Sequence, residues 1–332
     1  MAVYVNTNYS ALQGQRYLGN VQNQLTTTYQ RLSSGMRINS AKDDAAGLQI
    51  ADRLTSQING LNQGNRNASD GIALAQTIES GMDEISGMLQ KMRTLAVQAA
   101  NGTNTKEDRT ALSKEMAALA TEINRISSQT TFAGKTVLNG KLDGSIYGDA
   151  GGGGGGVPPA PGGNKLAGDK GSLTLQVGSN KGDTITFEVE SVYFSKLADD
   201  QQLVGNNKFF KNDNGTVTID LDKVTFGTPP AGQPGAGNNK TIGDVIDLMD
   251  KAIAKVDGMR AGLGALQNRL ESSIRNQSNV AANEADARSR IRDADFAEES
   301  ANLSQQSIIQ QAAASMLMQA NTRPQLGLSL LG

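Results

Sequence analysis

The distribution of proline is the feature that most limits how this 332-residue chain can fold. All seven prolines lie within 158–161, within 229–234 or at position 324, so residues 1–157 and 235–323 contain none. Proline breaks a helix more strongly than any other residue. The two long arms are therefore free to form long helices, whereas the segment between them follows a different pattern.

Apolar residues recur in both arms at steps of three and four, the period of an amphipathic helix. In the second arm this stripe runs without interruption from Ile242 to Leu270. The first arm carries three shorter stripes, from Leu48 to Leu61, from Met82 to Ala99 and from Leu112 to Ile126. Stripes this narrow are typical of the seam of a coiled-coil-like bundle, so each helix needs partners that cover it.

Local signals refine the helical prediction. Residues 40–43 (SAKD) and 105–108 (TKED) resemble capping boxes, and Asn101-Gly102 is a turn signal between two antiparallel helices. Glycines at 60, 64 and 71 weaken the pattern, because glycine costs about 1 kcal/mol at each helix-interior position. We therefore expect a bend or local fraying in that stretch.

Between the proline clusters the apolar period changes to two. Leu173–Val177 and Thr184–Val189 alternate apolar and polar residues around a short connection, which predicts a β-hairpin. Val217–Leu221 and Val224–Phe226 repeat the pattern after the turn signal Asn214-Gly215. The predicted fold class is mainly α, a long antiparallel coiled-coil-like helical bundle formed by both chain ends, with a small β-rich insert in the middle.

Composition excludes most chemistry. The chain has no His, no Cys and no Trp, which rules out His/Cys metal sites, thiol nucleophiles and imidazole triads. We therefore expect no enzyme activity, no cofactor and no metal. A net charge of -2 with interspersed signs argues against nucleic acid as a partner. The sequence has no apolar run of about 18 residues, so we expect no membrane insertion, and its start does not resemble a cleavable signal peptide.

The two chain ends, 1–43 and 288–332, are rich in Asn, Gln, Ser, Thr and Ala and carry a sparse apolar stripe. Isolated helices of this quality are marginal in water, because nucleation is costly. Frayed termini would explain them. The alternative that we favour is that both ends become ordered when copies of the chain assemble, since the two ends are amphipathic in the same way.

Several motifs at both ends resemble one family closely. Leu32–Leu48 reads LSSGMRINSAKDDAAGL and is the most specific of them. The others are NASDGI at 67–72, MRTLAVQAAN at 92–101, FAGKTVLNG at 132–140, GALQNRL at 264–270, ARSRIRDADFAEE at 287–299, and the segment from Gln310 to Gly332. These motifs identify the chain as similar to the bacterial flagellins, the subunits of the flagellar filament. The resemblance covers residues 1–140 and 240–332, and 173–197 more loosely.

The resemblance implies a domain organisation. Residues 1–43 and 288–332 would pair as terminal helices that form the filament core. Residues 44–142 and 240–287 would form the helical shaft domain around it. Residues 143–239 would be a short variable insert, with 173–190 a β-hairpin packed on the shaft and the remainder facing solvent.

It also implies a function. The chain would be a structural subunit that self-assembles into the helical flagellar filament used for motility, located outside the bacterium and exported by the flagellar type III route without a cleaved signal peptide. Two alternatives stay open. One is a hook–filament junction protein, which shares the terminal helices, and the other is a secreted coiled-coil type III effector or translocator.

The residues expected to make contacts between copies fall into two sets. Those predicted to pack in the filament core are Leu12, Leu18, Val21, Leu25, Leu32, Phe296, Leu303, Ile308, Met316 and Leu317. Those predicted to make charge contacts between copies are Arg31, Arg37, Asp43, Asp44, Arg292 and Asp295. A solvated charged face is the simpler explanation of the second set, because an exposed ion pair contributes only about 0–1 kcal/mol.

The implied partners are other copies of the chain in a helical homopolymer, an export chaperone on the C-terminal helix, and the filament cap and hook-junction proteins. Some flagellins are also recognised by vertebrate Toll-like receptor 5. By position in the motif, Lys91, Leu95 and Glu115 fall where that contact is made. Lys91 stands where the recognised relatives have Arg and lacks the planar bidentate fork of that residue, which predicts weakened recognition.

Overall fold

The structure is a computed structural model that describes residues 8–141, 144–147, 170–197, 210–213, 216–219 and 242–329. Of these described residues 75% are helical, with a small β insert between the helical arms, which confirms the predicted fold class. The helices are α1 (Tyr9–Ser34), α2 (Ala45–Ala99), α3 (Lys106–Gln129), α4 (Phe194–Leu197), α5 (Ile242–Arg292) and α6 (Phe296–Ser329). The strands are β1 (Thr131–Phe132), β2 (Lys135–Thr136), β3 (Gly171–Gln176), β4 (Thr184–Val189), β5 (Phe210–Asp213) and β6 (Thr216–Ile219).

The chain divides into two compact units, and α2 and α5 contribute to both. The terminal unit comprises Met1–Gly60 and Ser278–Gly332, and the central unit comprises Leu61–Gln277. The Gly- and Pro-rich segments 151–163 and 228–235, predicted to be linkers, lie outside the described residues.

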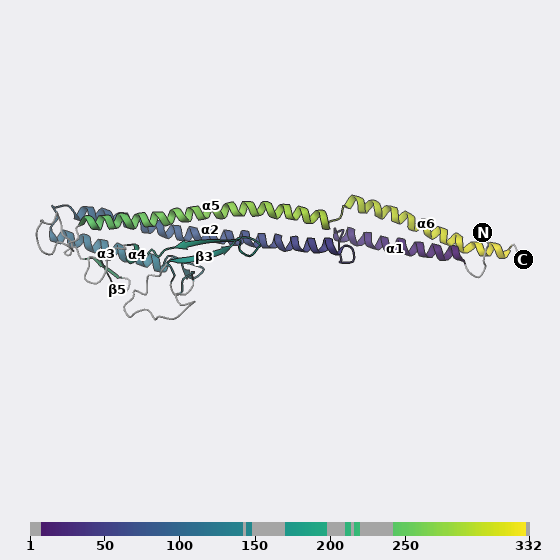
Figure 1. The fold of residues 1–332 in the computed structure, drawn as a ribbon, viewed down its shortest axis with the longest axis horizontal. Helices are drawn as coiled ribbons and strands as arrows, with labels where there is room; N and C mark the ends of the chain where they lie inside the picture. Colours follow the sequence, from purple (N-terminus) through teal and green to yellow (C-terminus); the bar gives the residue numbers. More distant parts are fainter. Residues whose placement is uncertain are drawn as a thin grey trace. The chain divides into compact units, whose positions relative to one another are not determined.

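In the terminal unit α1 and α6 lie side by side (Figure 1). Helix α1 begins after Asn8, whose side chain accepts a hydrogen bond from the backbone N–H of Ala11 at 3.1 Å. It ends at Gly35, which has a φ of 70° and donates its N–H to the carbonyl of Arg31 at 2.8 Å. A left-handed residue at this position favours glycine. Helix α6 begins after Asp295, whose carboxylate accepts from the N–H of Ala297 at 2.8 Å.

The two predicted capping boxes have different outcomes. Thr105 and Asp108 form the predicted reciprocal box at the start of α3. The box predicted at 40–43 is wrong, because Asp43 accepts from the N–H groups of Asn39 and Ser40 in a turn that precedes the helix. The cap of α2 is instead Asp44, which accepts from the N–H of Gly47 at 2.9 Å.

The core of the molecule lies in the central unit, where α2, α3 and α5 bury the stripes seen in the sequence. Residues of these helices that are fully shielded from solvent include Met82, Ile85, Leu89, Met92, Met116, Ile123, Val245, Met249 and Val256. Burying one large apolar side chain contributes about 1.5–3 kcal/mol, so this cluster stabilises the central unit without help from other copies. Arg93 pairs with Asp250 and Arg260 with Asp83, which ties α2 to α5 outside the apolar seam.

Strands β3 and β4 form an antiparallel hairpin in which Leu173 pairs with Phe187. The hairpin packs on α2 at two glycines. A Cβ added to Gly64 would overlap the carbonyl oxygen of Val177, and one added to Gly71 would overlap the Leu175 side chain. The expected fraying is wrong, because α2 is continuous through this stretch. The glycines here allow a close approach of the hairpin rather than interrupting the helix.

The second hairpin also differs from its prediction. Strand β6 pairs with β5 upstream, across the turn signal at 214–215, and the predicted partner 224–226 lies outside the described residues. Helix α3 holds this insert through side chains. Thr121 accepts from the N–H of Val217 at 3.2 Å, and Asn124 accepts from the N–H of Phe194 at 2.9 Å.

Gly64→Ala should destabilise the central unit by about 1–3 kcal/mol, because the new methyl meets backbone that cannot rotate away. Gly87→Ala on the same helix is the matched control. A Cβ there meets none of the described atoms within 4 Å, so this change should stabilise by up to about 1 kcal/mol. Urea unfolding followed by circular dichroism measures both. Equal stability of the two variants would contradict a close seat for the hairpin on α2.

Candidate functional site

Two common kinds of site are absent from the part of the chain that the structure describes. It contains no group of three or more His, Cys, Asp or Glu side chains placed to hold a metal ion. Among the same residues, no helix is both long enough and apolar enough to cross a membrane.

Exposed apolar side chains, by contrast, are abundant and unevenly distributed. Among the described residues, eleven of the twelve large apolar side chains that remain exposed belong to the terminal unit. The exception is Val97 in the central unit, which is 48% exposed. Those in the terminal unit are Tyr9, Leu12, Tyr17, Tyr29, Ile50, Val280, Phe296, Ile308, Ile309, Met316 and Met318. A soluble monomer seldom leaves so many large apolar groups on one part of its surface, so this surface is the candidate site.

A groove of about 600 Å³ lies on this surface between α1 and α6. Helix α1 contributes Tyr17 and Gly14, and helix α6 contributes Ile309 and Met316 among others. The helices approach closely here, since a Cβ on Gly14 would lie 3.2 Å from the Leu317 side chain. At the end of the pair where α1 begins, the side-chain amide of Asn8 donates a hydrogen bond to the carbonyl of Ala320 in α6 at 2.7 Å.

The ten residues predicted to pack between copies separate into two groups in the structure. Val21 and Leu25 are buried inside the terminal unit, and Leu18, Leu32, Leu303 and Leu317 are half-buried there. Leu12, Phe296, Ile308 and Met316 stay exposed, with Ile308 67% and Met316 69% accessible. The first group therefore holds α1 to α6 within one chain, and the second group is available to another copy.

The prediction from sequence missed the aromatic part of this surface. Tyr9, Tyr17 and Tyr29 of α1 are all exposed, although none belongs to the apolar stripe that indicated the helix. A large side chain off the stripe is the signal that could have found them. On a helix with one partner, such a residue lies outside the buried seam, either at its edge, as Tyr17 does in the groove, or away from the partner.

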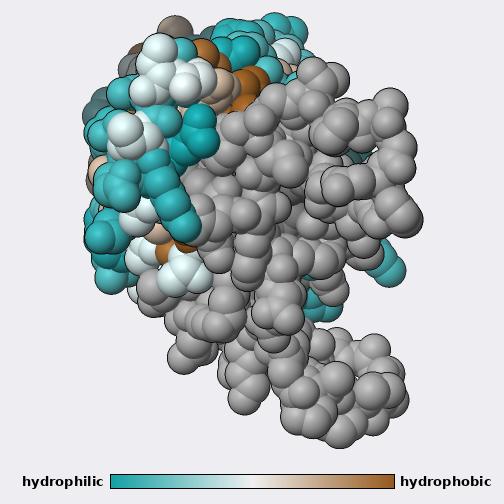
Figure 2. All heavy atoms as spheres, turned by 90° about the vertical axis from the view of Figure 1, so that its left-hand side faces the viewer, coloured by the Kyte–Doolittle hydropathy of each residue, from teal (hydrophilic) through white to brown (hydrophobic). Residues whose placement is uncertain are grey.

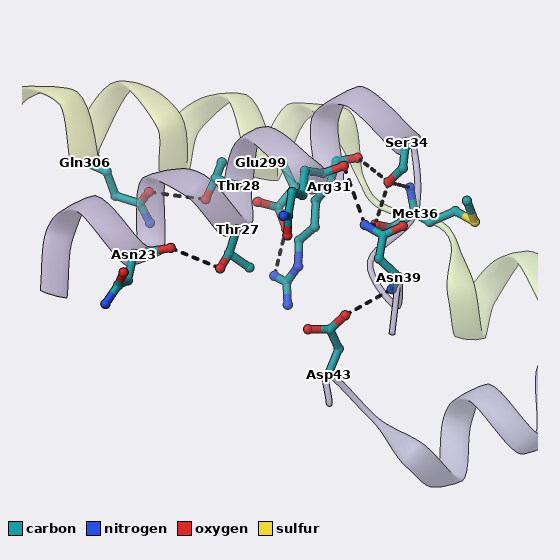
Figure 3. Close-up of polar contacts among 11 residues, drawn as sticks. Asn23, Thr27, Thr28, Arg31, Ser34, Met36, Asn39, Asp43, Glu299 and Gln306 are labelled. Atoms are coloured by element: carbon teal, nitrogen blue, oxygen red, sulfur yellow. Dashed lines mark hydrogen bonds and ion pairs between the residues drawn. The ribbon is translucent and has the colours of Figure 1, made fainter. Parts of the chain in front are cut away.

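The six charged residues predicted to contact other copies all have contacts within their own chain. Arg31 of α1 reaches Glu299 of α6 at 3.0 Å, and the Glu299 side chain is only 9% exposed (Figure 3). Asp43 accepts from Ser40 and Asn39, and these backbone hydrogen bonds hold the pKa of its carboxyl below the usual value. Asp44 and Asp295 cap α2 and α6, as described above.

Arg37 and Arg292 belong to a small backbone joint between the segment after α1 and the C-terminal end of α5 with the residues that follow it. The N–H of Arg37 donates to the carbonyl of Arg292 at 2.7 Å, and the N–H of Ala294 donates to the carbonyl of Gly35 at 3.0 Å. The guanidinium of Arg37 adds a hydrogen bond to the carbonyl of Ile291 at 2.9 Å. We call residues 35–44 and 288–295 the joint. The sequence motifs at 32–48 and 287–299 meet in it.

The three residues placed at the receptor contact lie in the central unit. Lys91 and Glu115 are exposed and form an ion pair at 2.8 Å between α2 and α3. Leu95 is one turn further along α2 and is only 7% exposed, because it packs into the core. Figure 2 faces the end of the central unit where α2 ends and α3 begins, and most of the described residues visible there are hydrophilic.

Comparison with protein families matches both arms of the chain. Residues 5–143 match the bacterial flagellin N-terminal helical region, and residues 246–331 match the bacterial flagellin C-terminal helical region. The chain belongs to the bacterial flagellins. It is therefore a structural subunit of the flagellar filament, which is extracellular and built by self-assembly, and this family is not one of enzymes.

Individual flagellins match over their whole length. Flagellin B of Vibrio cholerae is 37% identical over 377 aligned residues, and flagellin D of Vibrio anguillarum is 39% identical over 385, each covering all of both chains. A solved structure from Vibrio parahaemolyticus, assigned to a flagellar hook-associated protein, covers 76% of this flagellin and all of its own chain, with a TM-score of 0.51. Its 17% identity shows a shared fold alone, and neither of the two alternative functions is favoured by the comparisons.

The ion pair between α1 and α6 of this flagellin should stabilise the terminal unit. Glu299→Gln should weaken the pair by about 1–2 kcal/mol, because a charged hydrogen bond to a nearly buried carboxylate is replaced by a neutral one. Asp286→Asn removes the exposed pair with Arg290 in the same unit and should cost less than about 0.5 kcal/mol. Amide hydrogen exchange along α1 and α6 of the monomer measures the difference. Equal protection in both variants would contradict the assigned role of Glu299.

Proposed function

We propose that the exposed apolar surface of the terminal unit is the contact through which copies of this flagellin join the filament. The observation that carries the proposal is the concentration of exposed large apolar side chains in that unit. Covering each such side chain would contribute about 1.5–3 kcal/mol, from which the cost of ordering and immobilising the subunit must be subtracted. Several of them acting together are needed, which fits a surface spread along two helices.

The contact is heterologous, since a filament grows only when one patch binds a different patch on the next copy without closing a ring. In this arrangement Val21, Leu25 and their half-buried neighbours hold α1 on α6. Leu12, Phe296, Ile308 and Met316 face neighbouring copies, together with the tyrosines of α1. Before addition the ends are marginal in stability, because a two-helix pair with few buried apolar residues offsets little of the cost of ordering it.

The domain roles follow from this division. Residues 1–43 and 288–332 form the filament core as paired helices. Residues 44–142 and 240–287 form the shaft, whose buried seam needs no second copy. The insert, 143–239, carries its 173–190 hairpin on the shaft and otherwise faces solvent. The self-sufficient core of the central unit supports the assignment of the shaft.

The charged residues of the joint have a double role in the proposal. Their intrachain hydrogen bonds shape the joint, and the exposed members Arg37, Asp43, Asp44 and Asp295 also contact neighbouring copies. Contacts of this kind are screened by salt. Filament disassembly that is indifferent to ionic strength would remove the second role and leave the first.

Before assembly the same apolar surface needs a cover. A cytoplasmic export chaperone bound on α6 would shield Ile308, Ile309 and Met316. Export would follow the flagellar type III route, which needs no cleaved signal peptide. At the growing end the filament cap, and at the base the hook-junction proteins, would contact the same helices. Mass spectrometry of the N-terminus of exported protein tests the uncleaved start, and binding of the purified chaperone to chains with and without residues 290–332 tests its site.

Ile308→Glu should raise the critical concentration for polymerisation by about ten- to hundredfold, because it places a charge where an apolar side chain must be covered. Val97→Glu is the matched control, since it changes an exposed apolar residue of the central unit. It should polymerise like the parent. Sedimentation of filaments from solutions of known concentration measures both, with circular dichroism to show that each variant is folded. Equal loss in the control would contradict a surface confined to the terminal unit.

We extend the proposal to Toll-like receptor 5, with Lys91, Leu95 and Glu115 as the contact. Two of these residues are exposed and paired, whereas Leu95 offers little surface. Lys91→Arg should increase the potency of monomeric protein in a cell reporter assay, because Arg can pair bidentately with a carboxylate. Lys251 is an exposed residue of α5, so Lys251→Arg is the control and should leave the potency unchanged. No gain at Lys91 relative to that control would contradict its role.

A further inference from the structure

The methionines of the chain differ sharply in exposure. Ten are present in the sequence. Met82, Met92, Met116 and Met249 are fully shielded in the core of the central unit. Met316 and Met318 of α6 are 69% and 68% exposed. A reagent that attacks thioether sulfur in the free subunit would therefore reach α6 long before it reached that core.

The two exposed methionines are not equivalent. An α-helix turns by about 100° per residue, so Met318 points about 200° away from Met316. Met316 lines the groove between α1 and α6 opposite Tyr17, next to Ile309 and Ala313. Its long unbranched side chain suits a groove that must accept apolar groups from another copy. Oxidation of Met316 would place a polar group in that groove, whereas oxidation of Met318 would place one on a different side of the helix.

We propose that Met316 is an oxidation site at which a peroxide blocks addition of the free subunit to the filament. This inference rests on the proposed function, because it needs the groove to be covered during assembly. The thioether sulfur donates an electron pair to one peroxide oxygen, the O–O bond breaks, and a sulfur–oxygen bond forms. With hydrogen peroxide the other oxygen leaves as water after proton transfer. Sulfur is oxidised by two electrons and the peroxide is reduced by two.

The product is a methionine sulfoxide, a polar and chiral group in place of a flexible apolar one. In the free subunit the sulfoxide is solvated and costs little. In the assembled state the sulfoxide oxygen would be covered by apolar groups of another copy and would lose its hydrogen bonds with water. The apolar neighbours Ile309, Ala312 and Ala313 offer no donor, so its burial is unfavourable unless Ser10, Gln13, Tyr17 or Gln319 of the same groove turns to it. Oxidation therefore acts on assembly and leaves the central unit folded, because four of its methionines are fully shielded and the other two, Met88 and Met259, are partly buried against the same core. It is also reversible, since sulfoxide reductases restore the thioether.

Assembly should in turn protect the site. Once another copy covers the groove, the sulfur of Met316 is out of reach of the oxidant. The modification would then discriminate between subunits that are still free and subunits already in the filament.

The experiment uses the full chain as monomer, treated with dilute hydrogen peroxide until the exposed methionines have reacted. Peptide mass spectrometry should find sulfoxide at Met316 and Met318 and unmodified thioether at the four shielded positions. The critical concentration for polymerisation should rise at least tenfold, and sulfoxide reductase should restore it. Preformed filaments exposed to the same peroxide should react at Met316 at least tenfold more slowly than the monomer.

Two variants assign the effect. Met316→Leu keeps volume and apolarity, so it should polymerise normally and resist peroxide. Met318→Leu should polymerise normally and remain peroxide-sensitive. Normal polymerisation of chains that carry the sulfoxide at Met316 would overturn the proposal, and so would loss of sensitivity in Met318→Leu instead of Met316→Leu.

The result also separates this inference from the proposed function. If Ile308→Glu polymerises normally, the assembly surface itself is wrong. If Ile308→Glu fails to polymerise and the oxidised parent still polymerises, the surface stands and the oxidation site at Met316 is rejected.

Discussion

The packing of α1 on α6 is the interaction on which the rest of this flagellin depends, because it brings the two chain ends together in one unit. Asn8 donates a hydrogen bond to Ala320 at one end of the pair, and Thr28 donates one to Gln306 at 3.2 Å nearer the other end, where Figure 3 shows it. Together they fix the helices as an antiparallel pair. The Arg31–Glu299 ion pair lies near one end of this pair, close to the joint. Two segments that lie at opposite ends of the sequence therefore present one surface.

The central unit has the same kind of apolar stripes, but it covers them within one chain. Helices α2, α3 and α5 and the β3–β4 hairpin cover one another, so each stripe is buried within the chain. This requires close approach at Gly64 and Gly71, where any side chain would displace the hairpin. A buried ion pair is not needed, and the pairs between α2 and α5 are at the surface. The stability of this unit thus comes from packing, and the unit is independent of the number of copies present.

Much of the fold could be predicted from the sequence, because helical periodicity and capping are local. The unbroken stripe from Ile242 to Leu270 indicated most of α5, and Thr105 with Asp108 indicated the start of α3. The errors have a common cause in tertiary structure. Gly64 was interpreted as a weak point of α2, because local sequence does not show what the glycine is for. The hairpin that needs the space beside it is more than a hundred residues away in the sequence. The cap of α2 is Asp44 rather than Ser40, because residues 40–43 form a turn before the helix in which Asp43 accepts from the N–H of Ser40.

The candidate site was predicted less well than the helices, because the sequence does not show what covers each face of a helix. Periodicity indicates which residues of a helix are apolar on one side, but not which partner covers that side. Val21 and Ile308 both belong to predicted terminal stripes, yet the first is buried within the chain and the second is exposed. The backbone joint around Arg37 and Arg292 leaves no compositional signal, since backbone hydrogen bonds can be made by nearly any residue. Such contacts become visible only in three dimensions.

The geometry of a helix pair explains why the terminal unit leaves large apolar side chains exposed, as the proposed assembly surface requires. Two helices can bury only the faces that meet, so apolar residues elsewhere on α1 and α6 stay accessible until further helices arrive. Other copies of the same chain can supply those helices, provided that their charges do not oppose the approach. With 31 basic and 33 acidic side chains the subunit is nearly neutral, and pairs such as Arg290–Asp286 balance charge locally within α5. Identical copies therefore repel one another weakly, and in the proposed contact the burial of apolar side chains would contribute most of the free energy of association.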